Sequence, residues 1–284
     1  MTVMAGDSEN NPTIDPCRES WLGGLPVSIK RYRYEGKQQV QELLGTQYDR
    51  LLQYEKDASE WLLFEVSNET FSHDFLSPED NTSWSSYSNC ENLLLTKIMT
   101  KEHAAAIGAF QTALTVALVP MGLQTALQPY PSATVTGEER SKQGDNAWGP
   151  RRRPREHDRN WPTVVLEVAV SESQPKLTSD VRFWLGDGRG KVKIVFTLTV
   201  DRASPRIAIE KWVVEDDREH RKNKITICRN KNGHTHVTGG PLTIEFESLF
   251  LRAPELPREQ DIQFSDASLT ELTETIWEAQ GFKE

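Results

Sequence analysis

Apolar positions repeat at helical spacing in the first part of the chain. In residues 35–64 they recur every three or four positions, which predicts one amphipathic helix with a solvated polar face. The residues of this apolar stripe are Val40, Leu43, Leu44, Tyr48, Leu51 and Leu52. Residues 67–92 are rich in Ser, Asn and Asp and show no sustained period, so we expect a long polar surface loop there.

A second helix is expected at residues 104–123, which are almost continuously apolar. Thr100 is a suitable N-cap, and Glu102 and His103 would lie in the first turn, where the helix dipole favours an acid. The run is about as long as a bilayer requires, roughly twenty residues, but polar residues such as Gln111 interrupt it. We therefore predict a buried core helix and no contact with a membrane.

The second half of the chain has mainly the pattern of strands. These are expected at residues 133–136 and 161–170, and then at 191–200, 206–214, 224–228, 235–238 and 242–246. Two helices accompany them, and the second is expected to pack on the sheet. Their apolar stripes are Leu177, Val181, Trp184 and Leu185 in the first, and Leu269, Leu272, Ile276 and Trp277 in the second. This mixture of elements predicts an α/β or α+β protein.

Four regions follow from these elements. Residues 1–34 are predicted to be a flexible arm, and residues 35–99 a helical extension that ends in the polar loop. Residues 100–250 are predicted to be the folded core, and residues 251–284 a linker followed by a helix.

Charge, cysteine spacing and the N-terminal residues indicate which partners and which cell compartment to expect. The net charge of −9 over 284 residues argues against coating nucleic acid through a general positive field, but leaves a local basic groove open. Cys17, Cys90 and Cys228 lie far apart without metal-ligand spacing, which favours a reducing compartment. The first residues lack the apolar core of a signal peptide. We expect an intracellular protein, nuclear or cytoplasmic.

Glu167 is the chemically distinctive residue, because it lies in the otherwise apolar run of residues 164–170. An unpaired carboxylate in such a strand is costly. Either a buried basic partner such as Arg182, or a metal ion shared with a second acid, should hold it. Asp145 is the candidate second acid, since it follows a turn at residues 142–144 and precedes the return into the Glu167 strand. The residues alone leave both alternatives open.

The connection before the Glu167 strand carries five arginines within residues 151–159. Guanidinium groups bind phosphates well, so this run is a candidate nucleic-acid interface. The candidate contacts are Arg151, Arg152, Arg153 and Arg155. A solvated loop or a localisation signal explains the same run.

The order of these features resembles the PD-(D/E)XK, or restriction-endonuclease-like, superfamily. The likeness lies in a helix that opens with residues 101–103, a strand, an acid after a turn, and the strand Leu166-Glu167-Val168-Ala169-Val170, and it covers about residues 100–214. Within the superfamily, the chain is similar to Uma-type candidate endonucleases of bacteria. It is also similar to fungal proteins of unassigned function that share a Lys-Gln-x-Asp segment and a Trp-Pro-x-x-x-x-Glu-Val strand.

The resemblance implies a mixed sheet flanked by helices, with an N-terminal helical extension outside it, and a Mg²⁺ or Mn²⁺ ion as cofactor. Asp145 and Glu167 would be the metal-binding catalytic acids, and Glu102 an accessory acid. Carboxylates hold hard cations, which polarise a phosphodiester and lower the pKa of an attacking water. The implied partner is nucleic acid, with DNA expected, and a homodimer is left open.

Ala169 departs from the family pattern, which has a lysine at this position on the same strand face as the second acid. Lys142, Lys176 and Lys193 are candidates for a displaced lysine, and Lys193 is expected on the neighbouring strand. The sequence therefore leaves two main functions open, a Mg²⁺-dependent nuclease or an inactive nuclease-fold module that binds nucleic acid or a protein partner. A purely structural or assembly role is a third.

Overall fold

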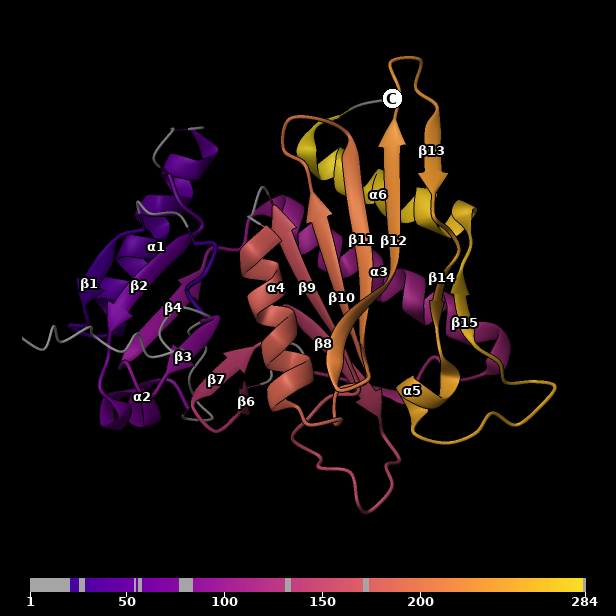
Figure 1. Cartoon of the computed structure of the whole chain (residues 1–284). Coiled ribbons are helices and arrows are strands. Elements are labelled where there is room, and N and C mark those ends of the chain that lie inside the picture. Colours follow the sequence, from indigo (N-terminus) through magenta and orange to yellow (C-terminus); the bar gives the residue numbers. More distant parts are fainter. Residues whose placement is uncertain are drawn as a thin grey trace, which may run out of the picture.

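The computed structural model describes residues 21–25, 29–53, 55, 58–76, 84–130, 134–170 and 174–282. Two sheets stand side by side in Figure 1, a smaller one built largely from the N-terminal third of the chain and a larger one built from the rest. Helices cover both faces of the larger sheet. The predicted mixture of helices and mixed sheets is confirmed.

The large sheet has seven strands in the order β13-β12-β11-β10-β9-β8-β5. They are β5 (Leu127–Pro129), β8 (Asn146–Pro150), β9 (Val164–Val170), β10 (Ile194–Val200), β11 (Arg206–Glu215), β12 (Arg218–Arg229) and β13 (Thr235–Thr238). β9 and β10 are parallel, and the other neighbours are antiparallel. Parallel neighbours need a crossover, which α4 (Gln174–Arg182) and the π-helical turn η2 (Phe183–Asp187) provide.

The opposite face of this sheet is covered by α3 (Lys101–Leu118) and α6 (Asp266–Gln280), which pack against each other. The remaining elements link these layers. They are η1 (Val119–Met121), β14 (Leu242–Ile244), α5 (Phe246–Phe250) and β15 (Ile262–Phe264), and β14 pairs with β15. Residue 246, predicted to end a strand, begins α5 instead. The C-terminal helix packs on the sheet as predicted, with Leu269, Ile276 and Trp277 buried.

α3 begins where predicted, because the Thr100 hydroxyl accepts a hydrogen bond from the His103 N–H at 3.4 Å. Its inner face reaches the core through Phe110, whose ring lies within 6 Å of three other aromatic rings. Within the described residues, Lys101–Met121 is the one helical segment whose length and composition would also suit a membrane span. Its packing against β9 and α6 agrees with the predicted core helix.

β9 is buried along its whole length. Leu166, Val168 and Val170 face the core beneath α3 and α6, while Val165 faces the core beneath α4. Because side chains alternate across a strand, Glu167 points to the α4 face. The fold therefore forces a carboxylate into the layer between the large sheet and α4.

The smaller sheet has six strands in the order β1-β2-β4-β3-β7-β6. They are β1 (Arg31–Arg33), β2 (Trp61–Glu65), β3 (Ser86–Ser88), β4 (Leu93–Lys97), β6 (Thr134–Thr136) and β7 (Arg140–Gln143), with α1 (Lys37–Leu52) and α2 (Asn68–Asp74) alongside. β7 lies in the predicted core and β3 in the predicted extension. Their pairing means that the predicted boundary at residue 99 runs through one sheet.

The single helix predicted for residues 35–64 is wrong at its C-terminal end, since the helix α1 stops at Leu52. Residues 61–64 form β2, where Trp61 and Leu63 face one apolar cluster and Leu62 and Phe64 face another. Continuous apolar residues suit a strand that is buried on both faces. A helix would have exposed some of them.

The polar loop predicted for residues 67–92 is also wrong in part. The Ser67 hydroxyl caps α2 by accepting the Thr70 N–H, and residues 86–88 form β3. The Phe71 ring stacks on Tyr87 with ring centroids 3.7 Å apart, so scattered aromatics create a small core that the sequence period did not reveal. Residues 77–83 of this segment lie outside the described residues.

The arm predicted for residues 1–34 needs a similar correction at its end. Trp21 is buried, with its indole Nε1 donating to Glu91 at 3.0 Å, and β1 joins the smaller sheet beside β2. Residues 1–20, including Cys17, lie outside the described residues.

Replacing Phe110 by alanine should lower the free energy of unfolding by about 3–5 kcal/mol, because it removes the ring that joins α3 to the sheet. Val116→Ala on the same helix is the control, since Val116 is 61% exposed, and should change stability by less than about 0.5 kcal/mol. Guanidinium unfolding measures both. Equal losses in the two variants would contradict the buried position of Phe110.

Candidate functional site

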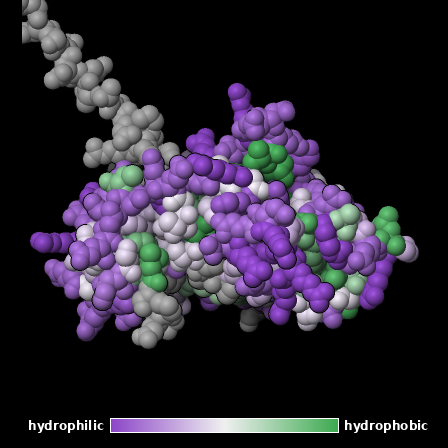
Figure 2. Space-filling model, turned by 90° about the horizontal axis from the view of Figure 1, so that it is seen from below, coloured by the Kyte–Doolittle hydropathy of each residue, from purple (hydrophilic) through white to green (hydrophobic). Residues whose placement is uncertain are grey.

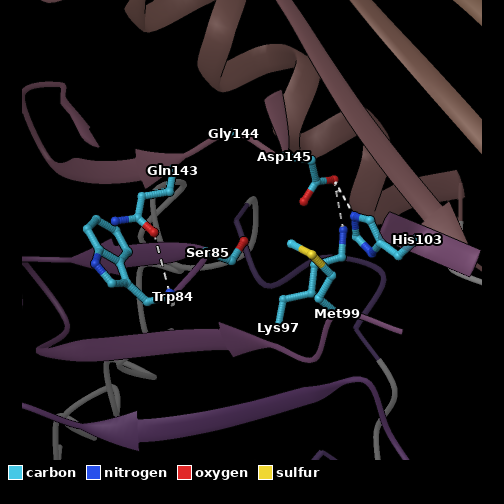
Figure 3. A pocket seen from close by; sticks show the side chains of 8 residues that line it. All are labelled: Trp84, Ser85, Lys97, Met99, His103, Gln143, Gly144 and Asp145. Carbon is cyan, nitrogen blue, oxygen red and sulfur yellow. Dashed lines mark hydrogen bonds and ion pairs between the residues drawn. The ribbon is translucent and has the colours of Figure 1, made fainter. Parts of the chain in front are cut away.

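Asp145 lies between β7 and β8, where the two sheets meet, and its side chain is only 10% exposed. Its Oδ2 accepts the Val168 N–H at 2.7 Å and the Lys97 ammonium at 3.2 Å. The His103 Nε2 lies 3.1 Å from the same oxygen, although neither ring nitrogen has a directed hydrogen bond within the described residues. Figure 3 shows Lys97 and His103 converging on this one oxygen.

Lys97 joins the smaller sheet to the large one. It ends β4, and its Nζ also donates to the carbonyl oxygen of Val168 at 2.7 Å. The same Nζ lies 5.1 Å from the ring centroid of Trp61 on β2, a cation–π distance. The ammonium group is thus held between a carboxylate oxygen, a backbone carbonyl oxygen and an aromatic ring.

Glu167 is fixed by groups from two other elements, and its side chain is 3% exposed. Its Oε1 accepts the indole N–H of Trp184, from the turn η2, at 2.5 Å. The Nζ of Lys142 on β7 lies 3.3 Å from the same oxygen. Of the two alternatives for Glu167, a buried basic partner or a shared metal ion, the structure shows the basic partner. This partner is Lys142 and not Arg182, which is exposed.

Lys142 connects Glu167 to a further carboxylate on α4. Its Nζ lies 3.0 Å from Oδ1 of Asp180, and the Lys176 Nζ donates to that oxygen at 2.5 Å. Lys142 makes these contacts as ion pairs and not as directed hydrogen bonds. Lys176 also lies 5.1 Å from the centroid of the Trp61 ring. Trp61 therefore covers two of the ammonium groups.

Burial and charge shift the pKa values in opposite directions. Burial would raise the pKa of Asp145, but His103 and Lys97 hold it well below its usual range. Burial would lower the pKa of Lys142, yet Asp180 and Glu167 keep it above its usual value. For Glu167 burial wins, with help from the negative charge of Asp145, and raises the pKa to about 7 despite Lys142.

Glu60 is a further buried acid, and it lies beside this cluster. Its carboxylate pairs with Arg202, which follows β10. Burial raises the pKa of Glu60 to about 7, against the opposing charges of Arg202 and Lys97 and with support from Glu102. This ion pair fastens the start of β2 to the end of β10.

The structure brings together only part of the predicted site. Asp145, Glu167 and Lys142 lie in one cluster. Glu102 neighbours it on α3, but has no hydrogen bond or ion pair to Asp145 among the described contacts. Lys193 is misplaced in the prediction, because it is exposed and precedes β10 by one residue. Glu167 pairs with Thr197, so Lys193 lies roughly 13 Å further along the strand at 3.3 Å per residue.

The arginine loop lies at another end of the molecule. Arg151, Arg152 and Arg155 are exposed, in the loop that hangs below the large sheet in Figure 1. Arg153 is not available for phosphate, because its guanidinium binds the carbonyl oxygens of residues 158, 159 and 161 and the Tyr130 hydroxyl. It is a structural residue that closes the loop.

Three residues of the site are not predicted from the sequence. The sequence places His103 only in the first turn of a helix and Lys97 only in the N-terminal extension, and it assigns no role to Asp180. A four-residue spacing of Lys176 and Asp180 on a helix is a signal that could have been used. Lys97 gave no such signal, because its contacts with Asp145 and Val168 depend on how the two sheets pack side by side.

A resident Mg²⁺ ion does not fit this arrangement of side chains. Asp145, Glu167 and Asp180 are each in contact with an ammonium group, so three carboxylates face three lysines. Little negative charge remains to attract a divalent cation. The described residues contain no group of three or more His, Cys, Asp or Glu side chains placed to hold a metal ion.

No protein-family model matches the sequence, and no curated protein sequence matches it. Among solved structures, the chain is similar to a DUF820 protein from Anabaena variabilis that is described as a candidate nuclease. The TM-score is 0.41 and the sequence identity 13%, over 74% of this chain and 99% of that chain. A likeness this distant assigns no function to the present chain, and the restriction-endonuclease-like character of the core stays a prediction.

The raised pKa of Glu167 predicts a pH dependence of stability. Between about pH 4.5 and 7, Glu167 binds more protons in the folded chain than in the unfolded chain, so its contribution to the free energy of unfolding should fall as the pH rises through this window. Glu167→Gln removes this contribution, so the free energy of unfolding of the variant should fall less steeply with pH than that of the parent, or rise more steeply.

Unfolding curves recorded from pH 5 to pH 8 measure this slope. Glu156→Gln, at an exposed loop position, is the control and should keep the slope of the parent. Identical slopes for the parent and Glu167→Gln would contradict the assigned burial and protonation of Glu167.

Proposed function

We infer that this chain is a nuclease-like module that binds nucleic acid without cutting it, and that its acid cluster is held in a metal-free form by lysines. The observation that carries this proposal is the pairing of Asp145, Glu167 and Asp180 with Lys97, Lys142 and Lys176. The resemblance to PD-(D/E)XK proteins, including the Uma-type and fungal groups, supplies the nuclease-like part of the proposal.

Access to the acids supports a non-catalytic role. The pocket beside Asp145 leaves about 20 Å³ for the centre of a water molecule, which is room for roughly one water. Its lining includes Trp84, Ser85, Met99 and Gln143, while Glu167 does not line it. A phosphodiester could not reach both acids together in this arrangement.

The second position after Glu167 also supports a non-catalytic role. Ala169 is buried and has no group that could orient water or neutralise a developing charge. Lys142 is directed at Glu167 and Asp180 as an ion-pair partner. The chemistry required for cleavage has therefore been replaced by mutual neutralisation.

The exposed arginines supply a surface for the nucleic acid. Arg151, Arg152 and Arg155 are exposed in the loop between β8 and β9. Lys193, which is also exposed, lies at the same end of the sheet, where its backbone N–H donates to the carbonyl oxygen of Thr163. Figure 2, seen from below the view of Figure 1, shows a largely hydrophilic surface at this end. The loop joins β9 at Val164, roughly 13 Å at 3.3 Å per residue from Val168, whose N–H binds Asp145, so binding there is separate from the acid cluster.

A Mg²⁺-dependent nuclease is the second candidate, and one observation favours it. Asp145 and Glu167 lie close enough for their charges to interact. The Asp145 oxygen that is not bound by Lys97 points into the pocket in Figure 3. This function would require the lysines to move away from the acids before a metal ion could bind.

Neutralising Arg151, Arg152 and Arg155 together by alanine should weaken binding to a labelled DNA duplex. The slope of log K against log salt should become shallower by up to about 3, because three phosphate contacts are lost. Fluorescence anisotropy at several salt concentrations measures both quantities. The control replaces Arg31, Lys101 and Lys231, three exposed cations elsewhere, by alanine and should leave the slope unchanged.

The same DNA incubated with Mg²⁺ or Mn²⁺ tests the absence of cleavage. The parent should leave it intact. Cleavage that disappears in Glu167→Ala would establish the nuclease instead, and equal salt slopes in both triple variants would refute the arginine interface.

A further inference from the structure

We propose that the groove between α3 and α6 is a docking surface for a partner protein, which inserts a helix with an apolar stripe flanked by lysines or arginines. The two helices pack against each other on the face of the large sheet opposite α4 (Figure 1). This inference goes beyond nucleic-acid binding and does not depend on it.

The groove is open and long enough for a helix. α3 lines one side of it from Ala105 to Ala117, and residues 263–275 of β15 and α6 line the other. It leaves about 300 Å³ for the centres of water molecules, far more than the space beside Asp145. Its α3 side extends roughly 18 Å at 1.5 Å per residue, about three helical turns. Half of its lining residues are exposed, namely Gly108, Thr112, Val116, Gln263, Glu271 and Thr275. Such an open groove suits a helix laid along it.

The outward face of α3 carries no charge. Between Glu102 and Gly122 the sequence contains no Asp, Glu, Lys or Arg. A surface helix has charged or polar residues on its solvent face, whereas a helix that is apolar all round is buried. Only 33% of the apolar stretch of this helix is buried, however, and Val116 is 61% exposed. The outward face of α3 therefore has the composition of a surface that another molecule covers.

Gly108 lies on this face and allows a neighbour to approach closely. Glycine within a helix is less favourable than alanine, and a Cβ at this position would meet no atom within 4 Å. The packing of this chain therefore does not require a glycine here. The absence of a side chain leaves room for the backbone of a second helix, since the distance between helix axes depends on the side chains at the contact.

α6 gives the groove an acidic wall. Residues 266–280 contain four acids and neither lysine nor arginine. Glu271 is the charged side chain among the described residues that line the groove. It is exposed, as is Glu278 further along α6, and neither has an ion-pair partner among the residues that the structure describes. Basic residues on the flank of the incoming helix would supply the complementary charge.

This charge pattern favours a basic partner over a second copy of the chain. A second copy would present its own uncharged α3 or its own acidic α6, and neither pairs with Glu271. Two copies would also each carry a net charge of −9. The apolar side of the groove and its acidic wall are both matched only by a helix that is apolar on one face and basic beside it.

The test uses a fluorescent synthetic peptide of about twenty residues, long enough to form a helix alone, with alanines and leucines on one face and lysines on both flanks. A second peptide has glutamates in place of the lysines. In fluorescence anisotropy, the parent should bind the lysine peptide roughly tenfold more tightly than the glutamate peptide. Failure of the parent to bind the lysine peptide would overturn the inference.

Gly108→Leu should weaken binding of the lysine peptide roughly tenfold or more, because its side chain fills the space that the partner requires. Gly45→Leu is the matched control, since Gly45 is exposed within α1 and a Cβ there also meets no atom within 4 Å, and it should bind as the parent does. Neither variant should have a lower melting temperature than the parent, because leucine is the better helix former. A lower melting temperature for Gly108→Leu alone would show that the fold itself needs the glycine, contrary to the inference.

Glu271→Lys tests the acidic wall. It should weaken binding of the lysine peptide roughly fivefold at low salt and strengthen binding of the glutamate peptide, with both effects reduced by added salt. Glu42→Lys, at an exposed position of α1, should leave both affinities nearly unchanged. Equal affinities of the parent, Gly108→Leu and Glu271→Lys would place the peptide elsewhere on the protein and refute the groove.

Sedimentation equilibrium separates a basic partner from a second copy. The parent should be a monomer, whereas a dimer that Gly108→Leu dissociates would show that a second copy fills the groove, and the basic partner would be wrong. DNA binding distinguishes this inference from the proposed function. Gly108→Leu should bind DNA as the parent does, and equal salt slopes in the two triple variants would refute the arginine interface without affecting the groove.

Discussion

The fold depends on how charges are neutralised where the two sheets meet. Taking a carboxylate or an ammonium out of water costs several kcal/mol per ion, and only close partners offset this. Glu167, Asp180, Lys142 and Lys176 are buried there, and the paired side chains of Asp145 and Lys97 are each 10% exposed. Glu167 comes from the large sheet, Asp180 from α4 and Asp145 from the turn between the sheets, while Lys97 and Lys142 come from β4 and β7 of the smaller sheet. The charges of each sheet are thus neutralised partly by the other. The ion pairs therefore make the two sheets one structure.

This dependence shapes the chemistry that the site can support. A metal-dependent hydrolase keeps carboxylate oxygens available for the ion and for water. Here, one carboxylate oxygen of each of Asp145, Glu167 and Asp180 is already in contact with an ammonium group. The Trp61 ring also covers the ammonium groups of Lys97 and Lys176. The same contacts that stabilise the packing of the sheets thus withhold the acids from solvent ions. Binding through the distant arginine loop is compatible with such a closed site.

The sequence predicted the parts of this arrangement that depend on local pattern. The apolar run around Glu167 required a buried partner or a metal, and the spacing of Leu269, Leu272 and Ile276 located a packed helix. It could not identify the partner, because Lys142 on β7 comes close to Glu167 only when β8, the strand after β7, pairs with β9 in the folded chain. Lys97 was hidden because its contacts depend on how the two sheets pack side by side. Residues 61–64 were assigned to a helix since both faces of β2 are apolar, which leaves no alternation to detect.

We propose that lysine ammonium groups, and not a metal ion, neutralise Asp145, Glu167 and Asp180. The most direct measurement is a crystal structure of the parent protein grown in millimolar Mn²⁺, with anomalous diffraction data recorded to locate the metal. We expect no anomalous peak between Asp145 and Glu167, and density for the Lys97 side chain reaching Asp145 and the Val168 carbonyl. A manganese peak bound by Asp145 and Glu167, with Lys97 or Lys142 turned away, would contradict it.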